Sequence, residues 1–414
     1  MSDAPFDQSL VPTALLALDL EAVAAQFGTP LFVYDEDHLR ARCREYAGQF
    51  GAENVAYASK AFLCLAMARL VAEEGLKLDV ATGGEMHVAL AAGFPPERLV
   101  FHGNNKSEDE ITAAREAGVA TIVADSFDEI ERLERLGFGG QVLVRATPGV
   151  EAHTHEYIET GTERSKFGFS VATGAALDAV RRVVASDALA FGGIHCHIGS
   201  QVYRLDSYAK AAAVVAEFAD RCEQDTGVAV PLLNLGGGLG ARYLTGDPVM
   251  DLAEYAQVVH EAIGDRRVMV EPGRSIAAAA AITVYRVGTV KTIAGVGTYV
   301  AVDGGMSDNP RPVLYGAGYE AYLPSRIAEP RPLVTTVVGK HCEQGDIIVT
   351  DAHLPADVHP GDLLVTPVTG AYGASMASNY NKVLRPAVVF VRDGRARVVV
   401  RRETLDDLVR LDTL

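Results

Sequence analysis

Residues 99–146 read LVFHGNNKSEDEITAAREAGVATIVADSFDEIERLERLGFGGQVLVRA. Three short apolar runs in this stretch alternate with two charged segments of helical length. Ser107 with Glu110 predicts the start of the first helix, because the hydroxyl and the carboxylate satisfy exposed backbone amides reciprocally. Ser126 with Glu129 repeats this capping box before the second helix. Strands and helices that alternate at this spacing predict parallel βαβ units.

The same alternation extends over the first two-thirds of the chain. The eight apolar runs are VAYASK (55–60), LDVAT (78–82), LVFHG (99–103), TIVAD (121–125), VLVRA (142–146), GGIHCHIG (192–199), LLNLGGG (232–238) and VMVEPG (268–273). They are almost continuously apolar, which is typical of strands covered on both faces. Eight such units predict a (β/α)8 TIM barrel over residues 36–275, with its active site where the C-terminal strand ends gather. We expect the polar segment from Val150 to Ser170 to form a long loop over the barrel mouth.

The pattern changes after Ser275. Residues 276–414 contain β-rich segments with short turns, and AVVFVRDGRARVVVRR (387–402) is typical of them. TPLFVYD (29–35) is also strand-like and precedes the first barrel helix. We therefore expect residues 1–35 and 276–414 to form a second, mostly antiparallel β domain. The predicted fold class is α/β plus β.

Composition restricts the class of protein. The 414 residues are 49% hydrophobic and carry a net charge of −17, which argues against broad binding to nucleic acid or anionic membranes. The N-terminus lacks the basic and apolar regions of a signal peptide, and no apolar stretch is long enough to predict a membrane span. The cysteines contain no CxxC pair, which fits a reducing cytoplasm and predicts neither disulfides nor a zinc ribbon. They are Cys43, Cys64, Cys196, Cys222 and Cys342.

Several strand ends carry residues suited to chemistry. Lys60 could form a Schiff base with an aldehyde if the barrel mouth desolvates it, or it could simply solubilise the strand end. The glycines of GGGLG (236–240) could open a helix and bind a phosphate through backbone amides, or they could form a tight turn without a ligand. Glu271 could face a pyridine nitrogen, or it could form a structural salt bridge with Arg274.

His195 and His197 lie two residues apart, on one face of a predicted strand. This spacing could indicate a metal site. The sequence shows no further ligands in a metal-binding pattern, so we expect no bound metal. A neutral imidazole can instead stack on a flat cofactor ring, and Ser200 can donate to a phosphate. In the β domain, the loops around Arg311 and Cys342 have the composition of ordinary β turns, which is the simplest interpretation of them.

Nine segments of the sequence, taken together, form a pattern that is specific enough to indicate a family. They are YASKAF (57–62), LDVATGGE (78–85), HGNNKS (102–107), HCHIGSQ (195–201), GGGLG (236–240), EPGRSI (271–276), DGGMSDNPRP (303–312), VGKHCEQGD (338–346) and GAYGASMASNYN (370–381). In this combination the chain resembles the diaminopimelate decarboxylases, pyridoxal-phosphate enzymes of the alanine-racemase-like barrel type. The resemblance covers almost the whole chain, from residue 28 to residue 408.

The resemblance implies pyridoxal 5′-phosphate as the cofactor and a homodimer whose active site is shared between subunits. Lys60 would hold the cofactor covalently, and Cys342 would be a proton donor delivered from the partner subunit. Implied cofactor-binding residues are Lys60, Asp79, His197, Ser200, Gly237, Gly238, Glu271, Gly273, Arg274 and Tyr372. Implied substrate-binding residues are Arg274, Arg311, Tyr315, Glu343 and Tyr372.

The implied reaction is decarboxylation of meso-2,6-diaminopimelate to L-lysine and CO₂, in lysine biosynthesis. One departure concerns the pocket for the distal amino group, because Gln344 stands beside Glu343 where the family usually has serine. A related decarboxylase with another amino acid or a carrier-bound substrate is therefore an alternative. A racemase that uses Cys342 as a second base opposite Lys60 is another. A binding protein without activity and a metal-dependent barrel hydrolase are the remaining alternatives.

Overall fold

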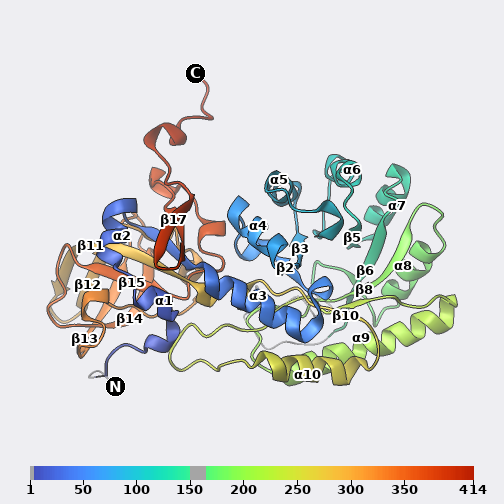
Figure 1. Ribbon diagram of the computed structural model, residues 1–414, viewed down its shortest axis with the longest axis horizontal. Coiled ribbons are helices and arrows are strands. Elements are labelled where there is room, and N and C mark those ends of the chain that lie inside the picture. Colours follow the sequence, from blue (N-terminus) through green and yellow to red (C-terminus); the bar gives the residue numbers. More distant parts are fainter. Residues whose placement is uncertain (1–3, 150–164) are drawn as a thin grey trace. The chain divides into compact units, whose positions relative to one another are not determined.

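The computed structural model describes residues 4–149 and 165–414 (Figure 1). The chain forms two compact units, and the short segment 241–249, which the sequence did not single out, belongs to the first of them. The first unit contains Met1–Leu39, Ala241–Val249 and Ile276–Leu414; the second contains Arg40–Gly240 and Met250–Ser275. The predicted functional boundaries, a cofactor-binding domain over 36–275 beside a β-rich domain, stay predictions.

The second unit is a closed barrel of parallel strands. Its strands are β2 (Ala56–Ala58), β3 (Lys77–Val80), β4 (Leu99–Phe101), β5 (Thr121–Ala124), β6 (Gln141–Thr147), β8 (Ala190–His195), β9 (Leu233–Asn234) and β10 (Val268–Met269), and each neighbouring pair is parallel. The Ala56 amide donates to the Val270 oxygen at 2.9 Å and the Val270 amide to the Asn54 oxygen at 3.0 Å, which joins the last strand to the first. The predicted TIM barrel is confirmed.

The barrel interior is filled by side chains. One buried cluster consists of five residues in barrel strands and of Leu232, which directly precedes β9: Ala56, Val100, Val123, Leu143, Leu232 and Met269. Branched and unbranched apolar side chains meet there, as in the packed core of barrels of this size.

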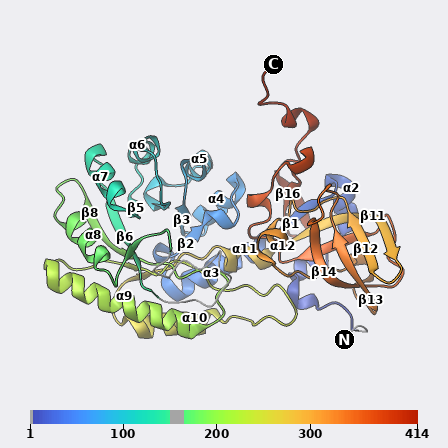
Figure 2. The same cartoon turned by 180° about the vertical axis from the view of Figure 1, so that it is seen from behind.

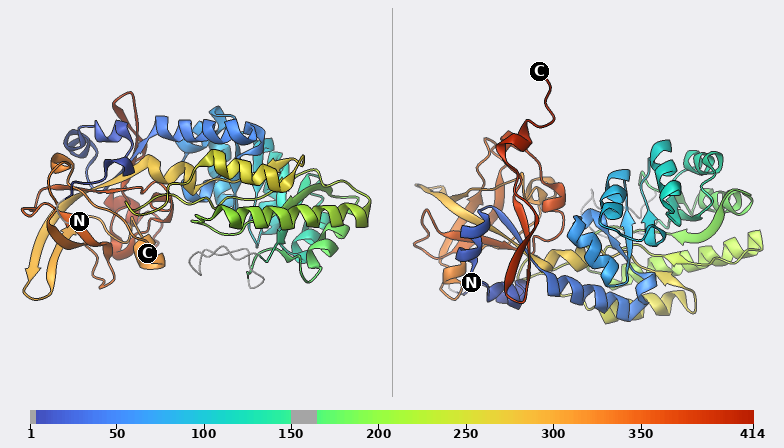
Figure 3. Two further views of the ribbon diagram at one scale, coloured as in Figure 1. Left: turned by 90° about the horizontal axis from the view of Figure 1, so that it is seen from below. Right: turned by 45° about the horizontal axis from the view of Figure 1, so that its top comes forward.

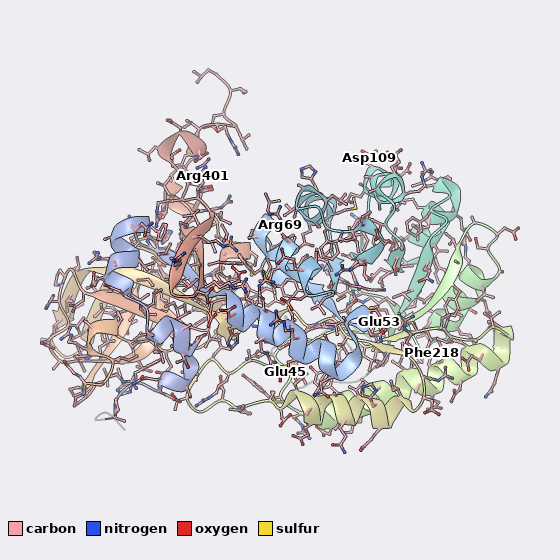
Figure 4. The ribbon with its side chains drawn as sticks, viewed as in Figure 1. Glu45, Glu53, Arg69, Asp109, Phe218 and Arg401 are labelled. Atoms are coloured by element: carbon pink, nitrogen blue, oxygen red, sulfur yellow. The ribbon has the colours of Figure 1, made fainter. Side chains whose placement is uncertain are left out.

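Helices follow the strands and form the outer layer (Figures 1 and 2). They are α3 (Glu36–Phe50), α4 (Leu65–Glu73), α5 (Gly83–Ala91), α6 (Glu108–Ala117), α7 (Phe127–Leu136), α8 (Ala175–Val184), α9 (Leu205–Thr226) and α10 (Leu252–Ile263), with the short 3₁₀ turns η2 (Ala52–Asn54), η3 (Ser59–Ala61) and η4 (Pro96–Arg98). Each of the α-helices buries apolar side chains on one side, so Phe218 of α9 is buried, whereas Glu45 and Asp109 are exposed (Figure 4).

The two predicted capping boxes have different outcomes. Before α6, the Ser107 hydroxyl accepts from the Glu110 amide at 3.1 Å, and the Glu110 carboxylate accepts from the Ser107 amide at 2.9 Å. Before α7, Ser126 accepts from the Glu129 amide at 3.3 Å, but the Glu129 carboxylate does not return the contact. Its Oε1 instead accepts from the buried ammonium of Lys106 at 2.6 Å, and its Oε2 accepts from the Asp125 amide, one position before the cap residue, at 2.9 Å. The carboxylate thus pairs with a buried charge and still satisfies a backbone amide beside the helix end.

The first unit contains the second sheet, in the order β14-β13-β12-β11-β1-β16-β17, with β15 paired to β11. Its strands are β1 (Leu31–Asp35), β11 (Ala281–Ile293), β12 (Gly297–Val302), β13 (Leu333–Val338), β14 (Ile347–Leu354), β15 (Leu363–Pro367), β16 (Ala387–Arg392) and β17 (Arg395–Val400). Two pairs are parallel, β1 with β16 and β12 with β13, and the other pairs are antiparallel. The predicted second domain of mostly antiparallel strands is confirmed, including its N-terminal strand (Figure 3).

Short helices complete this unit and its connection to the barrel. They are η1 (Gln8–Leu10), α1 (Thr13–Leu16), α2 (Leu20–Phe27), α11 (Arg274–Ala277), η6 (Ala278–Ala280), α12 (Arg311–Tyr315), η7 (Pro324–Arg326), η8 (Ala374–Met376), η9 (Tyr380–Lys382) and η10 (Leu405–Leu408). Within the described ranges, no helix is long and apolar enough to cross a membrane. The predicted mouth loop lies mostly outside the described residues, at 150–164. Its last two residues form β7 (Phe169–Ser170), which pairs with β6, so they are strand rather than loop.

Candidate active site

Polar side chains collect at the C-terminal ends of the barrel strands. Lys60 follows β2, Asp79 lies in β3, His102 follows β4, His195 ends β8, Asn234 ends β9 and Glu271 follows β10. Because all of these strands run parallel around one barrel, their C-terminal ends meet at one face. The sequence therefore scatters these residues over more than two hundred positions, and the fold collects them.

Glu271 is the centre of this group. Its Oε1 accepts from Asn234 Nδ2 at 2.6 Å and lies 2.8 Å from His102 Nε2, and its Oε2 lies 3.1 Å from His195 Nε2. The Gly236 amide in turn donates to Asn234 Oδ1 at 2.9 Å and fixes the orientation of that amide. Glu271 is thus a buried, rigidly held carboxylate. Its partners in the described part of the chain are two histidines and an asparagine, not Arg274 as in the salt-bridge alternative.

Charge is unevenly distributed over this cluster. Burial raises the pKa of Asp79 to about 6 and lowers that of His195 to about 4. Burial also opposes a charge on His102, but the carboxylates of Asp79 and Glu271 outweigh it and raise the pKa of His102. Burial opposes ionisation of Glu271, yet its contacts with His102 and His195 hold its pKa well below the usual range. At neutral pH, Glu271 is therefore ionised and His195 is neutral.

Lys60 lies in η3, directly after β2, with its side chain exposed. In the single chain this lysine is exposed, and its role in covalent chemistry stays a prediction. The side chain is still placed correctly for chemistry at the barrel mouth, because the neighbouring strand ends present Asp79 and Glu271. Its proposed covalent role needs access to an aldehyde, which an exposed amine has.

The glycine turn at 236–238 forms a backbone cradle. A Cβ on Gly237 would lie 2.2 Å from the backbone oxygen of Glu271, and one on Gly238 would lie 2.4 Å from the oxygen of Gly199. Only glycine fits at these positions. The hydroxyl of Tyr208, beside Gly238, is buried without a hydrogen-bond partner in the described structure. Glycines that let backbone amides approach a ligand, together with an unpaired hydroxyl donor, suit an anionic group such as a phosphate.

The turn does not open a helix, contrary to one sequence interpretation. The backbone after Gly238 is irregular, and α10 begins only at Leu252. A helix N-terminus therefore adds nothing to this cradle, and an anion would depend on backbone amides and side-chain donors.

We expect Gly237→Ala to weaken binding of the predicted cofactor by about 5- to 150-fold, because making room for the Cβ costs about 1–3 kcal/mol of local rearrangement. Titration of the bound cofactor by its visible absorbance measures this. Gly48→Ala is the matched control, because Gly48 lies on α3 with nothing within 4 Å of the added Cβ. Native affinity in Gly237→Ala would rule out the cradle.

His197 contacts this cradle directly, and Ser200 follows Gly199, which also lies against it, whereas a Cβ on Gly273 would instead meet Ala58 and Ala61. His197 falls after the end of β8 rather than on its face, and its Nδ1 accepts from the Gly237 amide at 3.3 Å. Burial lowers the pKa of His197 well below its usual value, so it is neutral, as a stacking imidazole should be. The Ser200 hydroxyl accepts from Arg274 Nε at 3.1 Å and Nη2 at 2.9 Å, which brings two predicted residues together.

The remaining predicted residues lie in the first unit. Arg311 is buried at the start of α12, with its guanidinium 4.2 Å from the centre of the Tyr243 ring and hydrogen-bonded to the Tyr319 hydroxyl. Aromatic rings on a buried guanidinium hold it in place without neutralising it. Tyr315 ends the same helix. Arg311 is therefore a fixed positive charge, suited to a carboxylate.

Cys342 and Glu343 are exposed on a loop that Asp346 organises. The Asp346 carboxylate accepts from the amides of Met306 at 2.6 Å and His341 at 2.8 Å, and contacts His341 Nδ1 at 2.9 Å. The Cys342 amide donates to the Asn381 side chain at 3.0 Å. The thiol is thus exposed on a rigid loop.

Tyr372 has a left-handed backbone, with φ of 61°, as does Val368 with φ of 59°. Such angles are unusual for these residue types and persist only where surrounding contacts impose them. One such contact is the Tyr34 hydroxyl, which donates to the Gly370 oxygen at 2.9 Å. That these first-unit residues join the barrel residues in one site stays a prediction.

The sequence analysis missed His102, Asn234 and Tyr208. His102 and Asn234 interrupt apolar strand runs with a polar residue, which was the available signal. His102, His195 and Glu271 also place three potential metal-ligand atoms within 4.8 Å of one another, a group that excludes His197. Each of these three side chains already contacts another member of the group. We therefore infer that the two histidines hold the Glu271 carboxylate in place.

The comparisons with known proteins agree with this geometry. The family model for the pyridoxal binding domain of pyridoxal-dependent decarboxylases matches residues 36–278. A barrel with a lysine, a glycine cradle and a buried carboxylate at its strand ends fits that cofactor. The chain is thus a pyridoxal-dependent decarboxylase by class, and the predicted cofactor, pyridoxal 5′-phosphate, is confirmed.

Individual relatives narrow the class. Diaminopimelate decarboxylase of Mycobacterium tuberculosis is 51% identical, over 96% of this chain and 94% of the relative, and that of Bacillus subtilis is 46% identical, over 95% and 94%. The crystal structure of diaminopimelate decarboxylase from Helicobacter pylori, complexed with L-lysine, superposes with a TM-score of 0.88 at 32% identity, over 95% of this chain and 99% of that one. The chain belongs to the diaminopimelate decarboxylase family.

Proposed function

We propose that this chain decarboxylates meso-2,6-diaminopimelate to L-lysine and CO₂. The observation that carries the proposal is the ionised, buried Glu271 at the strand ends of a barrel whose chain is 51% identical to a diaminopimelate decarboxylase. The Helicobacter pylori relative was crystallised with L-lysine, the product that this reaction would give. We assign the reaction to lysine biosynthesis.

The bound cofactor supplies an electron sink for the carbon that loses CO₂. The chain's own residues bind and orient it. Lys60 would attach it covalently, and Glu271 would accept from its pyridine nitrogen. The phosphate would lie on Gly237, Gly238 and the Ser200 segment, and His197 would stack on the ring. Asp79, Gly273 and Tyr372 complete the predicted cofactor contacts.

The substrate has charged groups at both ends, and the chain offers matching charges. Arg274 and the buried Arg311 would bind carboxylates by charge-assisted hydrogen bonds, together with Tyr315. Glu343 would bind the distal amino group, and its carboxylate is placed by the Tyr380 hydroxyl, which donates to it at 3.4 Å. Gln344 beside it is exposed, so the larger side chain has room in the single chain.

We also propose that two copies of the chain form a homodimer in the cytoplasm, with Cys342 of each subunit completing the site of the other. Cys342 and Glu343 are both exposed in the single chain, which leaves them accessible to a second copy. The five cysteines, four of them buried, form no disulfide with one another, which fits a reducing compartment.

We expect purified protein, saturated with cofactor, to release CO₂ from meso-diaminopimelate with at least about a hundredfold preference over ornithine, lysine and arginine, because a substrate lacking one of the matched charged groups leaves a buried site charge unpaired. Mass spectrometry of the products and measurement of released CO₂ test this. Racemisation without CO₂ release would make the chain a racemase instead. Release of CO₂ from another substrate at a higher rate would overturn the substrate assignment and point to Gln344.

A further inference from the structure

His102 lies between two buried carboxylates. Its Nε2 is 2.8 Å from Glu271 Oε1 and 3.8 Å from Asp79 Oδ1. All three side chains are less than a tenth exposed. Two carboxylates this close repel each other strongly where water is excluded, so a positive charge between them is needed to keep both in place.

The two oxygens of Glu271 are used unequally. A carboxylate offers about two acceptor positions on each oxygen. Oε1 takes two donors, Asn234 Nδ2 and His102 Nε2, whereas Oε2 takes one in the described structure, His195 Nε2 at 3.1 Å. The remaining acceptor position is therefore on Oε2.

The two histidines that contact Glu271 differ in charge. His195 is buried among Glu271, His102 and Arg145, and its Nδ1 has no partner among the described residues. An unpaired buried nitrogen is tolerated when it carries no proton, so His195 donates through Nε2 and stays neutral. His102 faces Asp79 and Glu271, which both favour its charged form, and Arg145, which opposes it. Of the charges around Asp79, Lys60 favours its ionised form and Glu85 opposes it.

We propose that His102 is a positioning residue, held as the protonated bridge between Asp79 and Glu271, which occupies Oε1 of Glu271 and leaves Oε2 for the pyridine nitrogen of the cofactor. The proposal rests on the proposed role of Glu271 toward the cofactor. It gives His102, the first residue of HGNNKS (102–107), a function that the sequence analysis did not assign: keeping the Glu271 carboxylate ionised and correctly oriented before the cofactor binds.

His102→Gln tests the charge without removing the hydrogen bond, because glutamine keeps an N–H donor near the position of Nε2. Without the positive charge, ionised Glu271 is less stable, its pKa rises, and it takes up a proton at a higher pH. We expect the acid-induced change in the absorbance of the bound cofactor to move up by at least about one pH unit, the lower end of the effect of a neighbouring charge. The measurement needs no substrate.

His195→Gln is the matched variant, because it also keeps a donor to Glu271 but removes no charge. It should move the same transition by much less. His87→Gln, at an exposed position on α5, controls for the substitution itself. Equal shifts in His102→Gln and His195→Gln, or no shift in either, would overturn the proposal.

A second readout covers the case in which His102→Gln no longer binds the cofactor. Nitrogen-15 NMR of histidine-labelled native protein, cofactor bound, reports which imidazoles carry two protons, and the variants assign the signals. His102 should carry two protons at neutral pH and His195 one. A neutral His102 would refute the bridge whatever the variant does. Neither readout uses turnover, so failure to decarboxylate diaminopimelate would count against the proposed function alone.

Discussion

Replacement of Lys60 by alanine is expected to abolish covalent attachment of the cofactor and to lower turnover to less than about one thousandth of the native rate, a loss of at least about 4 kcal/mol in transition-state stabilisation. The reason is chemical: at this strand end an amine is the group that condenses with an aldehyde, and alanine has no replacement for it. Borohydride reduction followed by intact mass measurement shows whether the chain retains the cofactor.

Folding should be almost unaffected by this change. Lys60 is exposed in η3, so its removal should alter the free energy of unfolding by no more than about 0.5 kcal/mol. Lys60→Arg keeps the positive charge but cannot form the covalent link, and should be as inactive as Lys60→Ala. Lys291→Ala, at an exposed position on β11, is the matched control and should keep cofactor and activity. Near-native decarboxylation by Lys60→Ala would contradict the mechanism.

The barrel could be predicted because its determinants are local. Each apolar run, each capping residue and each glycine after a helix is visible within about ten residues, and parallel strands that alternate with helices leave few topologies. The β-rich domain could be predicted from local patterns in the same way. This includes β1, whose partner β16 lies more than three hundred residues later. Chain position alone could not have shown that the two strands pair in parallel.

The site was predicted less completely, and the reason is geometric. Lys60 and Glu271 could be picked out because each is a charged residue at the end of an apolar run. The importance of His102 and Asn234 becomes visible only once β4, β9 and β10 are assembled in the barrel. Whether Glu129 completes its capping box depends on Lys106, twenty-three positions earlier, pairing with it. Exposure is equally non-local, and the sequence could not decide whether the Lys60 side chain is desolvated or exposed.

Cys342→Ala is expected to retain the absorbance of the bound cofactor and to slow product formation by about 10²–10⁴-fold, the usual contribution of a positioned proton donor. The structure supports a specific loss, because the loop that carries Cys342 is held by Asp346 and Asn381 through backbone amides of the loop and the His341 ring. Removing the thiol leaves those contacts in place. Single-turnover kinetics would separate slow protonation from slow CO₂ release, and unchanged kinetics would remove Cys342 from the mechanism.

Mixing the two variants tests whether the site is shared between subunits. In a hybrid dimer of Lys60→Ala and Cys342→Ala chains, a shared arrangement combines the native Lys60 of one subunit with the native Cys342 of the other. Half of randomly paired dimers are hybrids with one intact site of two, so the mixture should recover about a quarter of the native rate. If each chain used its own cysteine, no site in any dimer would hold both groups. Activity of the mixture would then stay at the level of the separate variants, and the exposure of Cys342 would need another explanation.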